Sequence, residues 1–414
     1  MRGCGITIRH TVTEYTTNHT AASLSDLDRQ MISVVPPGGN WKNIPESIPS
    51  KRLAQIRESY ANREGSRSTY YGRLRWDRPA YTISTCFNRP GNGCHIHPAA
   101  DRLITVREAA RIQSFPDWYH FHGAKTSIYK QVGNAVPPLL AFVIAKQLRI
   151  RNFVNLYCGA GGMSLGFEEA GATPILAADI DEQICETYRR NRERDPLAVL
   201  TTDLSTEKAK RQVAKKVHEH VGSLDAVIGG PPCQGFSHAG NARTPEDPRN
   251  RCVFDFIDLV KVLKPRIVVM ENVPGIMTLE RGRAITVIRE RFAKIRYPVS
   301  LNILSAVEFG IPQRRKRVFL IASDEATRYE LKGILSADHQ VSVFDAISDL
   351  PLQPASSDEE RVEYVKTPQT HYQRMLRGHI TYENYMRSLS SQADPRKQHP
   401  TQYKVPLLDA YSRQ

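Results

Sequence analysis

The sequence predicts an α/β protein built on a doubly wound, mostly parallel sheet. From residue 152 onward, short apolar segments of strand length alternate with longer amphipathic segments. These amphipathic segments are long enough for the crossover helices that parallel strands require. Glycines and acidic residues follow several of the apolar segments directly, at the strand ends where such sheets bind ligands.

The apolar segments have the length and residue types of buried strands, and the alternation stops near residue 324. The predicted strands are Phe153–Tyr157, Ile175–Ala178, Ala226–Gly229, Ile267–Glu271, Ser300–Ser305 and Arg317–Ala322. A further strand is expected before Asp203. The predicted crossover helices are Glu182–Asn191, Thr206–His220 and Cys252–Leu263.

The rest of the chain is less regular. A helix is expected over Ser50–Arg63, and aromatic and β-branched residues predict a strand region over 66–86. Thr105 and Glu108 have the spacing of a capping box at the start of a helix. Pro138–Leu148 is predicted to be an apolar helix that begins with proline. Residues 354–414 are polar and show no clear period, and disorder is an open alternative for about the last thirty of them.

The charge predicts a polyanionic partner. The formal net charge of the 414-residue chain is +14. Residues 1–75 hold 11 Lys and Arg against 6 Asp and Glu, and residues 76–150 hold 9 against 4. The basic surface is therefore expected mostly on the first 150 residues. A nonspecific basic surface is the alternative.

The cysteines predict a reducing compartment, and the hydropathy predicts no membrane-spanning segment. Seven cysteines form no close pairs, which argues against a disulfide framework. No apolar run approaches the roughly 20 residues of a membrane span. We expect a cytoplasmic protein. No metal is expected, because one cluster of thiols and imidazoles fits no common zinc spacing: Cys86, Cys94, His95 and His97.

The first predicted strand leads into a glycine-rich turn, Tyr157-Cys-Gly-Ala-Gly-Gly162, before a helix. Such a turn lets a cofactor approach the backbone and the helix N-terminus, and NAD, FAD and S-adenosylmethionine all use it. Asp179 ends the second strand and is placed to accept ribose hydroxyls, and Asp203 is placed to bind an adenine amino group. Alone, each carboxylate is equally well explained as a solvated strand end. Together they predict an adenosine site.

A strand-end loop, Gly229-Gly-Pro-Pro-Cys-Gln-Gly-Phe-Ser237, presents the candidate nucleophile. Two prolines cannot continue a central strand, so Cys233 is expected in an exposed turn. A thiolate there can attack an electrophile. The alternative is a buried structural cysteine.

The candidate acid and cations come from two more strands. Glu271 ends a buried strand, where burial can hold a carboxyl protonated for acid catalysis, and a structural ion pair is the alternative. In the basic run Gln313-Arg-Arg-Lys-Arg317, alternation sends Arg315 and Arg317 to one face, toward the active edge of the sheet. A solvated basic face is the alternative.

These motifs, taken together, resemble the DNA (cytosine-5) methyltransferases. The resemblance rests on the Cys233 loop, Glu271-Asn-Val, the run ending at Arg317, and Asn155–Gly162, where Asp-Leu-Phe is more usual than Asn-Leu-Tyr. Two further segments, Arg102–Pro116 and Tyr129–Pro138, look like the family's ninth and tenth motifs.

The order of the motifs departs from the family. The ninth and tenth motifs precede the first, which resembles a circular permutation with Gln147–Asn152 as the joining segment. The implied fold is a Rossmann-like methyltransferase domain with a smaller, irregular target-recognition domain. The predicted division is 1–75 and 331–414 for target recognition, 151–330 for the catalytic and cofactor core, and 76–150 completing that core.

The resemblance also implies roles. Cys233 would add to carbon-6 of a flipped-out cytosine, Glu271 would bond ring N3 and the exocyclic amine, and Arg315 and Arg317 would steady the base. S-adenosylmethionine would be the methyl donor. Its implied contacts are Asn134, Ala135, Tyr157, Gly159, Gly161, Gly162, Asp179, Ile180, Asp203, Leu204 and Pro231. The implied DNA contacts are Gln234, Ser237 and Arg251, on a lid over 234–251.

The expected partner is duplex DNA with a specific sequence, and a cognate restriction endonuclease is expected by family habit. A monomer is expected. Two other interpretations stay open: a transfer-RNA cytosine-5 methyltransferase, whose motifs can be nearly the same, and a non-catalytic DNA-binding protein on the same fold.

Overall fold

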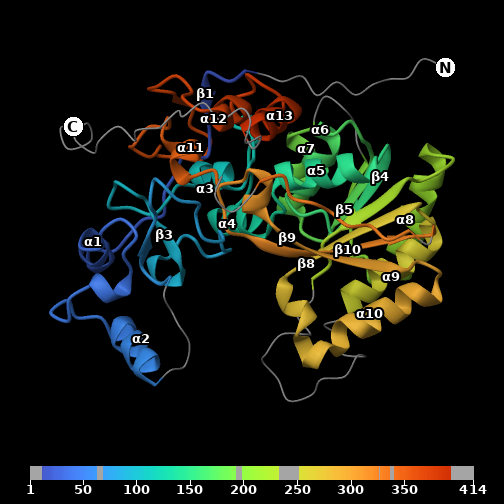
Figure 1. Ribbon diagram of the computed structural model, residues 1–414, viewed down its shortest axis with the longest axis horizontal. Helices are drawn as coiled ribbons and strands as arrows, with labels where there is room; N and C mark the ends of the chain where they lie inside the picture. Colours follow the sequence, from blue (N-terminus) through green and yellow to red (C-terminus); the bar gives the residue numbers. More distant parts are fainter. Residues whose placement is uncertain are drawn as a thin grey trace.

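A seven-stranded sheet runs through the centre of the molecule (Figure 1). Its strand order is β6-β5-β4-β7-β8-β10-β9. In chain order the strands are β4 (Asn152–Leu156), β5 (Thr173–Asp179), β6 (Ala198–Thr201), β7 (Ala226–Gly229), β8 (Ile267–Asn272), β9 (Val299–Ser305) and β10 (Lys316–Ser323). The computed structural model describes residues 12–62, 69–192, 198–232, 251–325, 327–335 and 340–392.

The first five strands of that order are mutually parallel, and β10 runs antiparallel to both β8 and β9. The prediction of a mostly parallel α/β sheet is confirmed. The run before Asp203 is β6, whose bounds the sequence had left open. The antiparallel end differs from a purely parallel sheet because β9 and β10 are joined by a short connection rather than a crossover helix.

Side chains alternate between two apolar layers along each central strand. Phe153 points into one layer and Val154 into the other. The first layer holds α3 (Val106–Ile112), α4 (Lys125–Asn134), α5 (Pro138–Leu148) and α6 (Gly162–Glu169). The second holds α8 (Glu207–His220), α9 (Arg251–Leu263) and α10 (Arg283–Lys294). Helices therefore cover both faces of the sheet.

Helix α5 leads into β4 and packs along α6, which follows β4. The two helices approach so closely that a Cβ added to Gly166 of α6 would lie 2.1 Å from the Pro138 carbonyl oxygen. Only residues 149–151 separate α5 from β4. The predicted helix over Pro138–Leu148 is confirmed.

The helical stretch Lys125–Leu148 is apolar and long enough to cross a membrane by length and composition alone. In the structure, however, 89% of its most apolar window is buried inside the protein. It is therefore built like the core helices of a globular protein.

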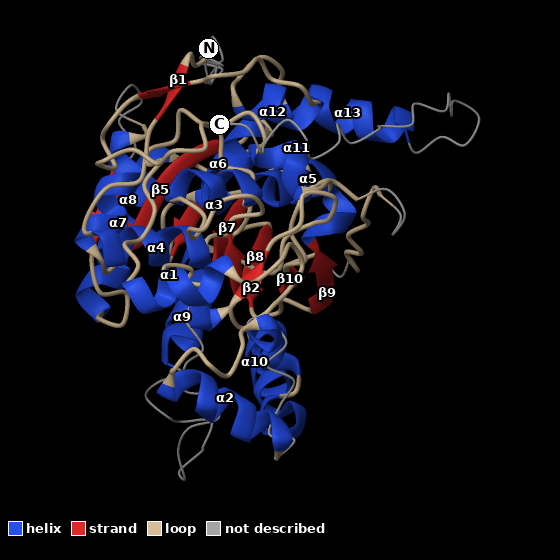
Figure 2. Ribbon diagram, turned by 90° about the vertical axis from the view of Figure 1, so that its left-hand side faces the viewer, coloured by secondary structure: helices blue, strands red, loops and turns tan. Residues whose placement is uncertain are grey.

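Residues 24–61, which we call the N-terminal lobe, build a separate small core together with Tyr71, Ile96 and Leu103. The lobe contains α1 (Asp26–Ser33), the 3-10 turn η1 (Trp41–Asn43) and α2 (Lys51–Ala61). Ser50 caps α2 through the Leu53 amide, which confirms the expected helix. Helices α2 and α10 extend from the same side of the sheet (Figure 1, Figure 2).

Arg73 joins the N-terminal lobe to the rest of the chain. Its buried guanidinium donates to the carbonyls of Ile32 (2.8 Å) and Val35 (2.6 Å) in the lobe. It also donates to the His97 carbonyl (3.0 Å) and to Asp101 Oδ1 (2.6 Å). Five hydrogen-bond donors on one planar group suit this role.

The strand region predicted over 66–86 was wrong for most of its length. Within the described residues, β2 covers only Gly72–Arg73, and it pairs with β3 (Cys94–Ile96). Aromatic and branched side chains there are buried one at a time by loops, for example Tyr71 and Ile83. The backbone bonds to scattered partners and not to one ladder, as in Leu74 N to Ile96 O and Ala80 N to Pro312 O.

Regular structure also occurs after residue 354, where the sequence showed no clear period. Helices α12 (His371–Leu376) and α13 (Tyr382–Gln392) follow the short helix α11 (Val343–Ile347). Tyr385 and Leu389 of α13 pack into the same core as α3 and α5. Residues 393–414, within the stretch for which disorder was the open alternative, lie outside the described residues.

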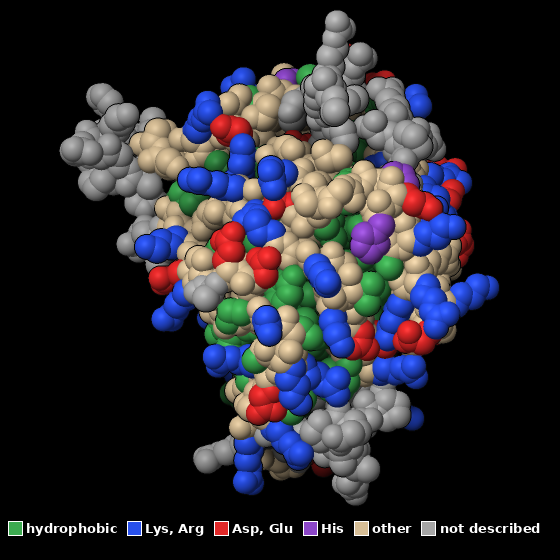
Figure 3. Space-filling model, turned by 90° about the vertical axis from the view of Figure 1, so that its right-hand side faces the viewer, with side chains coloured by type: hydrophobic (Ala, Val, Ile, Leu, Met, Phe, Trp, Pro, Cys, Tyr) green, Lys and Arg blue, Asp and Glu red, His purple; other side chains and the backbone are tan. Residues whose placement is uncertain are grey.

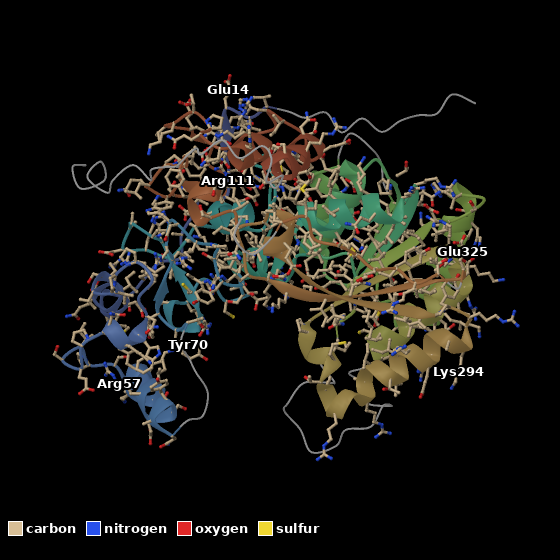
Figure 4. The ribbon with its side chains drawn as sticks, in the orientation of Figure 1. Glu14, Arg57, Tyr70, Arg111, Lys294 and Glu325 are labelled. Atoms are coloured by element: carbon tan, nitrogen blue, oxygen red, sulfur yellow. The ribbon has the colours of Figure 1, made fainter. Side chains whose placement is uncertain are left out.

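A buried ion network fixes this C-terminal segment to the region before β4. Arg111 donates to Asp117 (2.8 and 2.5 Å) and to Asp349 (2.5 Å), and all three side chains are fully buried. Asp349 also accepts from Arg377. Figure 4 shows Arg111 in the interior between these segments. The described part of 340–392 is therefore packed on the main core, while the division into domains stays a prediction.

Candidate active site

A pocket of about 590 Å³ opens at the carboxyl ends of β4, β5, β7 and β8. Ligands bind at this edge in open α/β sheets. Twelve of the residues singled out from the sequence line it: Asn134, Ala135, Tyr157, Gly159, Gly162, Asp179, Ile180, Asp203, Leu204, Pro231, Glu271 and Arg317. The pocket therefore brings the candidate cofactor residues and part of the candidate catalytic set together.

Some predicted residues lie elsewhere. Cys233, Gln234 and Ser237 fall outside the described residues, as does nearly all of the expected lid over 234–251. Pro232, the last described residue before them, lines the pocket. Arg251 begins α9, and its guanidinium donates to the Ser205 carbonyl (3.0 Å).

The turn after β4 adopts the tight conformation that its glycines favour. Gly159 and Gly161 have φ of 54° and 82°, and Tyr157 has φ of 55°. A Cβ on Gly162 would lie 2.4 Å from the Val136 carbonyl oxygen, so α6 begins pressed against the segment that carries Asn134 and Ala135. Glycine at 162 lets α6 approach this backbone more closely than any larger residue would allow.

A buried polar network holds the back of this turn. Tyr119 Oη donates to the Ala160 carbonyl, and Arg192 donates to Tyr119 Oη (3.3 Å) and to Glu168 (2.8 Å). The Arg192 guanidinium lies 3.9 Å from the ring centroid of Tyr188. Gly161 packs against this network and does not line the pocket, because a Cβ there would lie 2.9 Å from Tyr119 Oη.

Asp179 faces the turn from the end of β5. Its Oδ2 accepts from Gly159 N (3.0 Å), and its Oδ1 accepts from Asp181 N (3.2 Å). Burial raises the pKa of the Asp179 carboxyl, and these backbone donors oppose the rise only in part. The exposed side chain of Ile180 follows directly and lines the same pocket.

Asp203 follows the neighbouring strand β6, where Thr202 N donates to the Asp179 carbonyl (2.8 Å). Asp203 Oδ1 accepts from Ser205 N (2.9 Å), and this hydrogen bonding lowers the pKa of the carboxyl. Charge from Arg251 lowers it further.

Asn155 occupies the position where the family more usually has aspartate. Its Nδ2 donates to Ser164 Oγ (2.7 Å). Its Oδ1 is buried and accepts no hydrogen bond within the described part of the chain. Since Asn155 lines the pocket, this unpaired acceptor fits a ligand that brings a donor.

Glu271 and Arg317 form an ion pair at the other end of the pocket. Arg317 Nε lies 2.8 Å from Glu271 Oε1, across the antiparallel strands β8 and β10. Burial raises the pKa of Glu271, and the charges of Arg317 and Arg315 oppose the rise. The net direction is upward, so the carboxyl holds its proton at a higher pH than a free glutamic acid.

Arg315 is buried beside this pair but does not line the pocket. Its guanidinium donates to the carbonyls of Ile83 (3.2 Å) and Gly133 (3.0 Å). The sequence alternation predicted that Arg315 and Arg317 would share one face toward the active edge. Only Arg317 lines the pocket, because the chain becomes a regular strand only at Lys316. Arg315 supports the segment next to Asn134.

Several lining residues were not singled out from the sequence. Cys252, at the start of α9, lines the pocket, and burial raises the pKa of its thiol. Lys130, Met163, Ile184 and Thr202 also line it. The sequence could have drawn attention to Cys252, because this residue opens a predicted helix. The other residues reach the pocket through tertiary packing, which no sequence pattern indicated.

Comparison with known proteins is consistent with this geometry. The family model of C-5 cytosine-specific DNA methylases matches residues 6–149 and 151–413. Type II methyltransferase M.DdeI of Desulfomicrobium norvegicum is 36% identical over 236 residues, which cover 55% of this chain and 54% of that protein. M.AgeI of Thalassovita gelatinovora is 31% identical over 253 residues, 55% of this chain and 58% of the relative. This chain therefore spans about half the length of each.

M.AquIA of Picosynechococcus is 33% identical over 230 residues, which cover 49% of this chain and 89% of that protein. Among solved structures, the Dnmt2 methyltransferase of S. pombe matches with a TM-score of 0.38 and 20% identity, over 50% of this chain and 62% of the other. The family match extends over nearly the whole sequence, and the chain belongs to the C-5 cytosine-specific DNA methylase family.

Proposed function

We propose that this protein transfers a methyl group from S-adenosylmethionine to carbon-5 of a cytosine within a specific duplex DNA sequence. One observation carries the proposal. A single pocket joins the glycine turn and Asp179 to the Glu271–Arg317 pair, so a cofactor and a base can meet there. The family supports the same chemistry and the same cofactor.

The residues present fit the cofactor. The turn over 157–162 leaves its backbone open to the pocket, and Asn155 Oδ1 offers an acceptor without a partner among the described residues. Asp179 would take the ribose hydroxyls, Ile180 the adenine face, and Asp203 with Leu204 the adenine edge. Asn134, Ala135 and Pro231 would close the methionine end. When bound, S-adenosylmethionine supplies an electrophilic methyl group on a sulfonium.

Cys233 would form the covalent bond to the base. Its thiolate adds to carbon-6, and the electron pair displaced from the ring makes carbon-5 the nucleophile that takes the methyl group. After a base removes the carbon-5 proton, the sulfur–carbon-6 bond breaks and the thiolate is restored. Each cycle therefore adds one methyl group and releases one proton.

Glu271 would donate a proton or a hydrogen bond to ring N3 as negative charge develops there. Its raised pKa suits this role, because a protonated carboxyl can donate near neutral pH. Arg317 would hold Glu271 in place and contact the base. Arg315 would act through the segment at Gly133 and so position Asn134.

The target cytosine would be flipped out of the duplex, since carbon-6 cannot be reached inside the stack. The segment 234–251 would close over it, with Gln234, Ser237 and Arg251 near the flanking phosphates. Residues 1–75 and 331–414 would contribute to target recognition, with 151–330 as the catalytic core completed by 76–150.

The motif order supports a circular permutation. Helix α5, at the end of the tenth-motif segment, packs on α6 and reaches β4 through three residues, so this join needs no long linker. We also propose that the protein acts as a monomer in the bacterial cytoplasm, at the nucleoid, as the methylase of a restriction–modification system with a cognate endonuclease. The Type II names of the relatives support that system.

Trapping the covalent intermediate tests the proposal. Duplex DNA that carries 5-fluorocytosine should form a stable adduct with the protein and S-adenosylmethionine, because fluorine cannot leave as the proton does. The adduct would be read by mass spectrometry and mapped to Cys233. Cys233→Ser is the control and should form none while it still binds DNA. Tritiated methyl transfer to transfer RNA but not to DNA would contradict the proposed substrate.

A further inference from the structure

A second pocket, of about 370 Å³, lies where the N-terminal lobe meets the chain just before β10. Its walls come from Gly38 and Asn40 of the lobe, from Gly72, from Arg75 and Arg78, and from Arg314. We call it the arginine pocket. It shares no lining residue with the pocket at the strand ends.

Glycines shape this pocket. Gly72 has no room for a side chain, because a Cβ there would lie 2.7 Å from Cys94 Cβ. At Gly38, which has φ of 79°, a Cβ would lie 2.8 Å from Cδ of Arg75. The missing side chains let the backbone of the lobe and the stem of Arg75 pack together. The site is thus a fixed concavity with backbone at its wall.

The pocket carries an excess of positive charge. Arg75 is paired with Asp77 through two hydrogen bonds of 2.8 and 2.6 Å. Arg78 reaches the same carboxylate only at 3.9 Å, and more than half of its side chain is exposed. The exposed Arg314 side chain makes no hydrogen bond or ion pair within the part of the chain that the structure describes. A fourth lining arginine, Arg73, is paired with Asp101. Two of the four cations therefore lack a full partner.

The position relative to the active site is set by the backbone. Arg314 N donates to Ala80 O (2.8 Å), and Thr82 Oγ1 donates to Arg314 O (3.1 Å), so Arg314 is anchored on both sides. Arg317, which lines the active-site pocket, is three residues further along. Three residues span at most about 11 Å.

We propose that the arginine pocket binds a backbone phosphate of the DNA on one side of the target cytosine. The inference rests on the proposed function, because it takes DNA as the substrate. Guanidinium groups and backbone in a fixed concavity suit a phosphate group, which they can bind in a bidentate way. The contact would set the register of the duplex on the enzyme and would carry no sequence information of its own.

Three variants test it: Arg314→Ala, Arg78→Ala and the conservative Arg314→Lys. Affinity is measured by fluorescence anisotropy with a labelled mixed-sequence DNA duplex over a range of salt concentrations. Each alanine variant should weaken binding and reduce the slope of log K against log salt by about one. Arg314→Lys should keep most of the slope, because the charge remains.

Lys294→Ala is the matched control. Lys294 is exposed at the end of α10, at the opposite side of the molecule from Tyr70 and the lobe (Figure 4). Its removal should leave the slope unchanged. Binding of S-adenosylmethionine, followed by calorimetry, should be unaffected in all the variants.

Two results would overturn the inference. In the first, the wild-type protein binds and methylates DNA, and Arg314→Ala and Arg78→Ala bind DNA with the same affinity and the same salt slope as the wild type. The other is an altered preference for one base pair with an unchanged slope, which indicates base recognition. A wild-type protein that binds no DNA would instead refute the proposed function.

Discussion

Glu271 and Arg317 face each other across β8 and β10, with 2.8 Å between Oε1 and Nε. Burial pushes the pKa of Glu271 up while Arg317 pulls it down. Removal of the cation, as in Arg317→Gln, should therefore raise the pKa of Glu271 further. If protonated Glu271 is the reactive form, activity should fall at a higher pH in the variant than in the wild type.

The measurement is the pH dependence of kcat with saturating DNA and cofactor. The absolute rate should also drop, since Arg317 is expected to contact the base. An alkaline limb at the same pH as in the wild type, or at a lower one, would show that Glu271 does not act as the acid.

Tyr119→Phe should weaken cofactor binding without slowing the chemical step. The variant removes the hydrogen bond to the Ala160 carbonyl at the back of the glycine turn. A hydrogen bond of this kind contributes about 1 kcal/mol, so KM for S-adenosylmethionine should rise about fivefold while kcat stays unchanged.

Tyr15→Phe is the control, because Tyr15 is partly exposed and far from the turn in sequence and in contacts. A fall in kcat with an unchanged KM would show that Tyr119 does not position the cofactor-binding turn.

Gly162→Ala should destabilise the fold. The added methyl group would lie 2.4 Å from the Val136 carbonyl oxygen, which is backbone and cannot rotate away. Overpacking of this kind costs about 1–3 kcal/mol. Gly222→Ala should cost nothing, since no atom lies within 4 Å of the new Cβ. Urea denaturation measures both, and equal midpoints for the two variants would be the contrary result.

Asp117→Asn should lower stability at neutral pH and flatten its dependence on acid. Burial raises the pKa of Asp117, but Arg111 more than offsets this, so the folded-state pKa is lowered. Its contribution is therefore present above the unfolded-state pKa of about 4 and is lost as pH falls through the folded-state pKa. Loss of one partner of a buried pair costs about 3–5 kcal/mol.

Asp26→Asn provides the comparison, because Asp26 pairs with Arg29 on the surface of α1. Urea midpoints measured from pH 7 to pH 3 should fall less steeply for Asp117→Asn than for Asp26→Asn and the wild type. Identical slopes would mean that the Arg111 network does not control acid stability.

The net charge of the chain does not tell where cationic side chains gather on the surface. Figure 3 shows a face on which Lys and Arg are interspersed with Asp and Glu. The excess cations of the arginine pocket instead come from two separated parts of the chain, residues 73–78 and Arg314. The sequence predicted a basic N-terminal portion, but only the fold brings Arg314 to it.

The central sheet could be predicted because its strands are buried on both faces and so read as continuous apolar runs. The strand region over 66–86 failed, since Tyr71 and Ile83 are buried by loops and not in a ladder. Helix α13 was missed although Tyr382, Tyr385, Met386 and Leu389 recur at helical spacing and are buried. The polar residues between them hid that period.

The candidate site was predictable where a motif lies at a strand end, as at Asp179 and Glu271. The network behind the glycine turn was not, because Tyr119 and Arg192 come from segments on either side of it in sequence and meet only through packing. Arg315 shows the same limit. Its partners, Ile83 and Gly133, are more than 180 residues away along the chain.

The close approach of α5 and α6 has a practical consequence for engineering. Their interface is formed by side chains and backbone on each helix and does not depend on the peptide bonds at residues 149–151. A gene divided there should yield two polypeptides, one with α3, α4 and α5 and the other with the whole central sheet, that find each other and rebuild one core. Methylation could then be switched on by bringing the two halves together with fused dimerising tags.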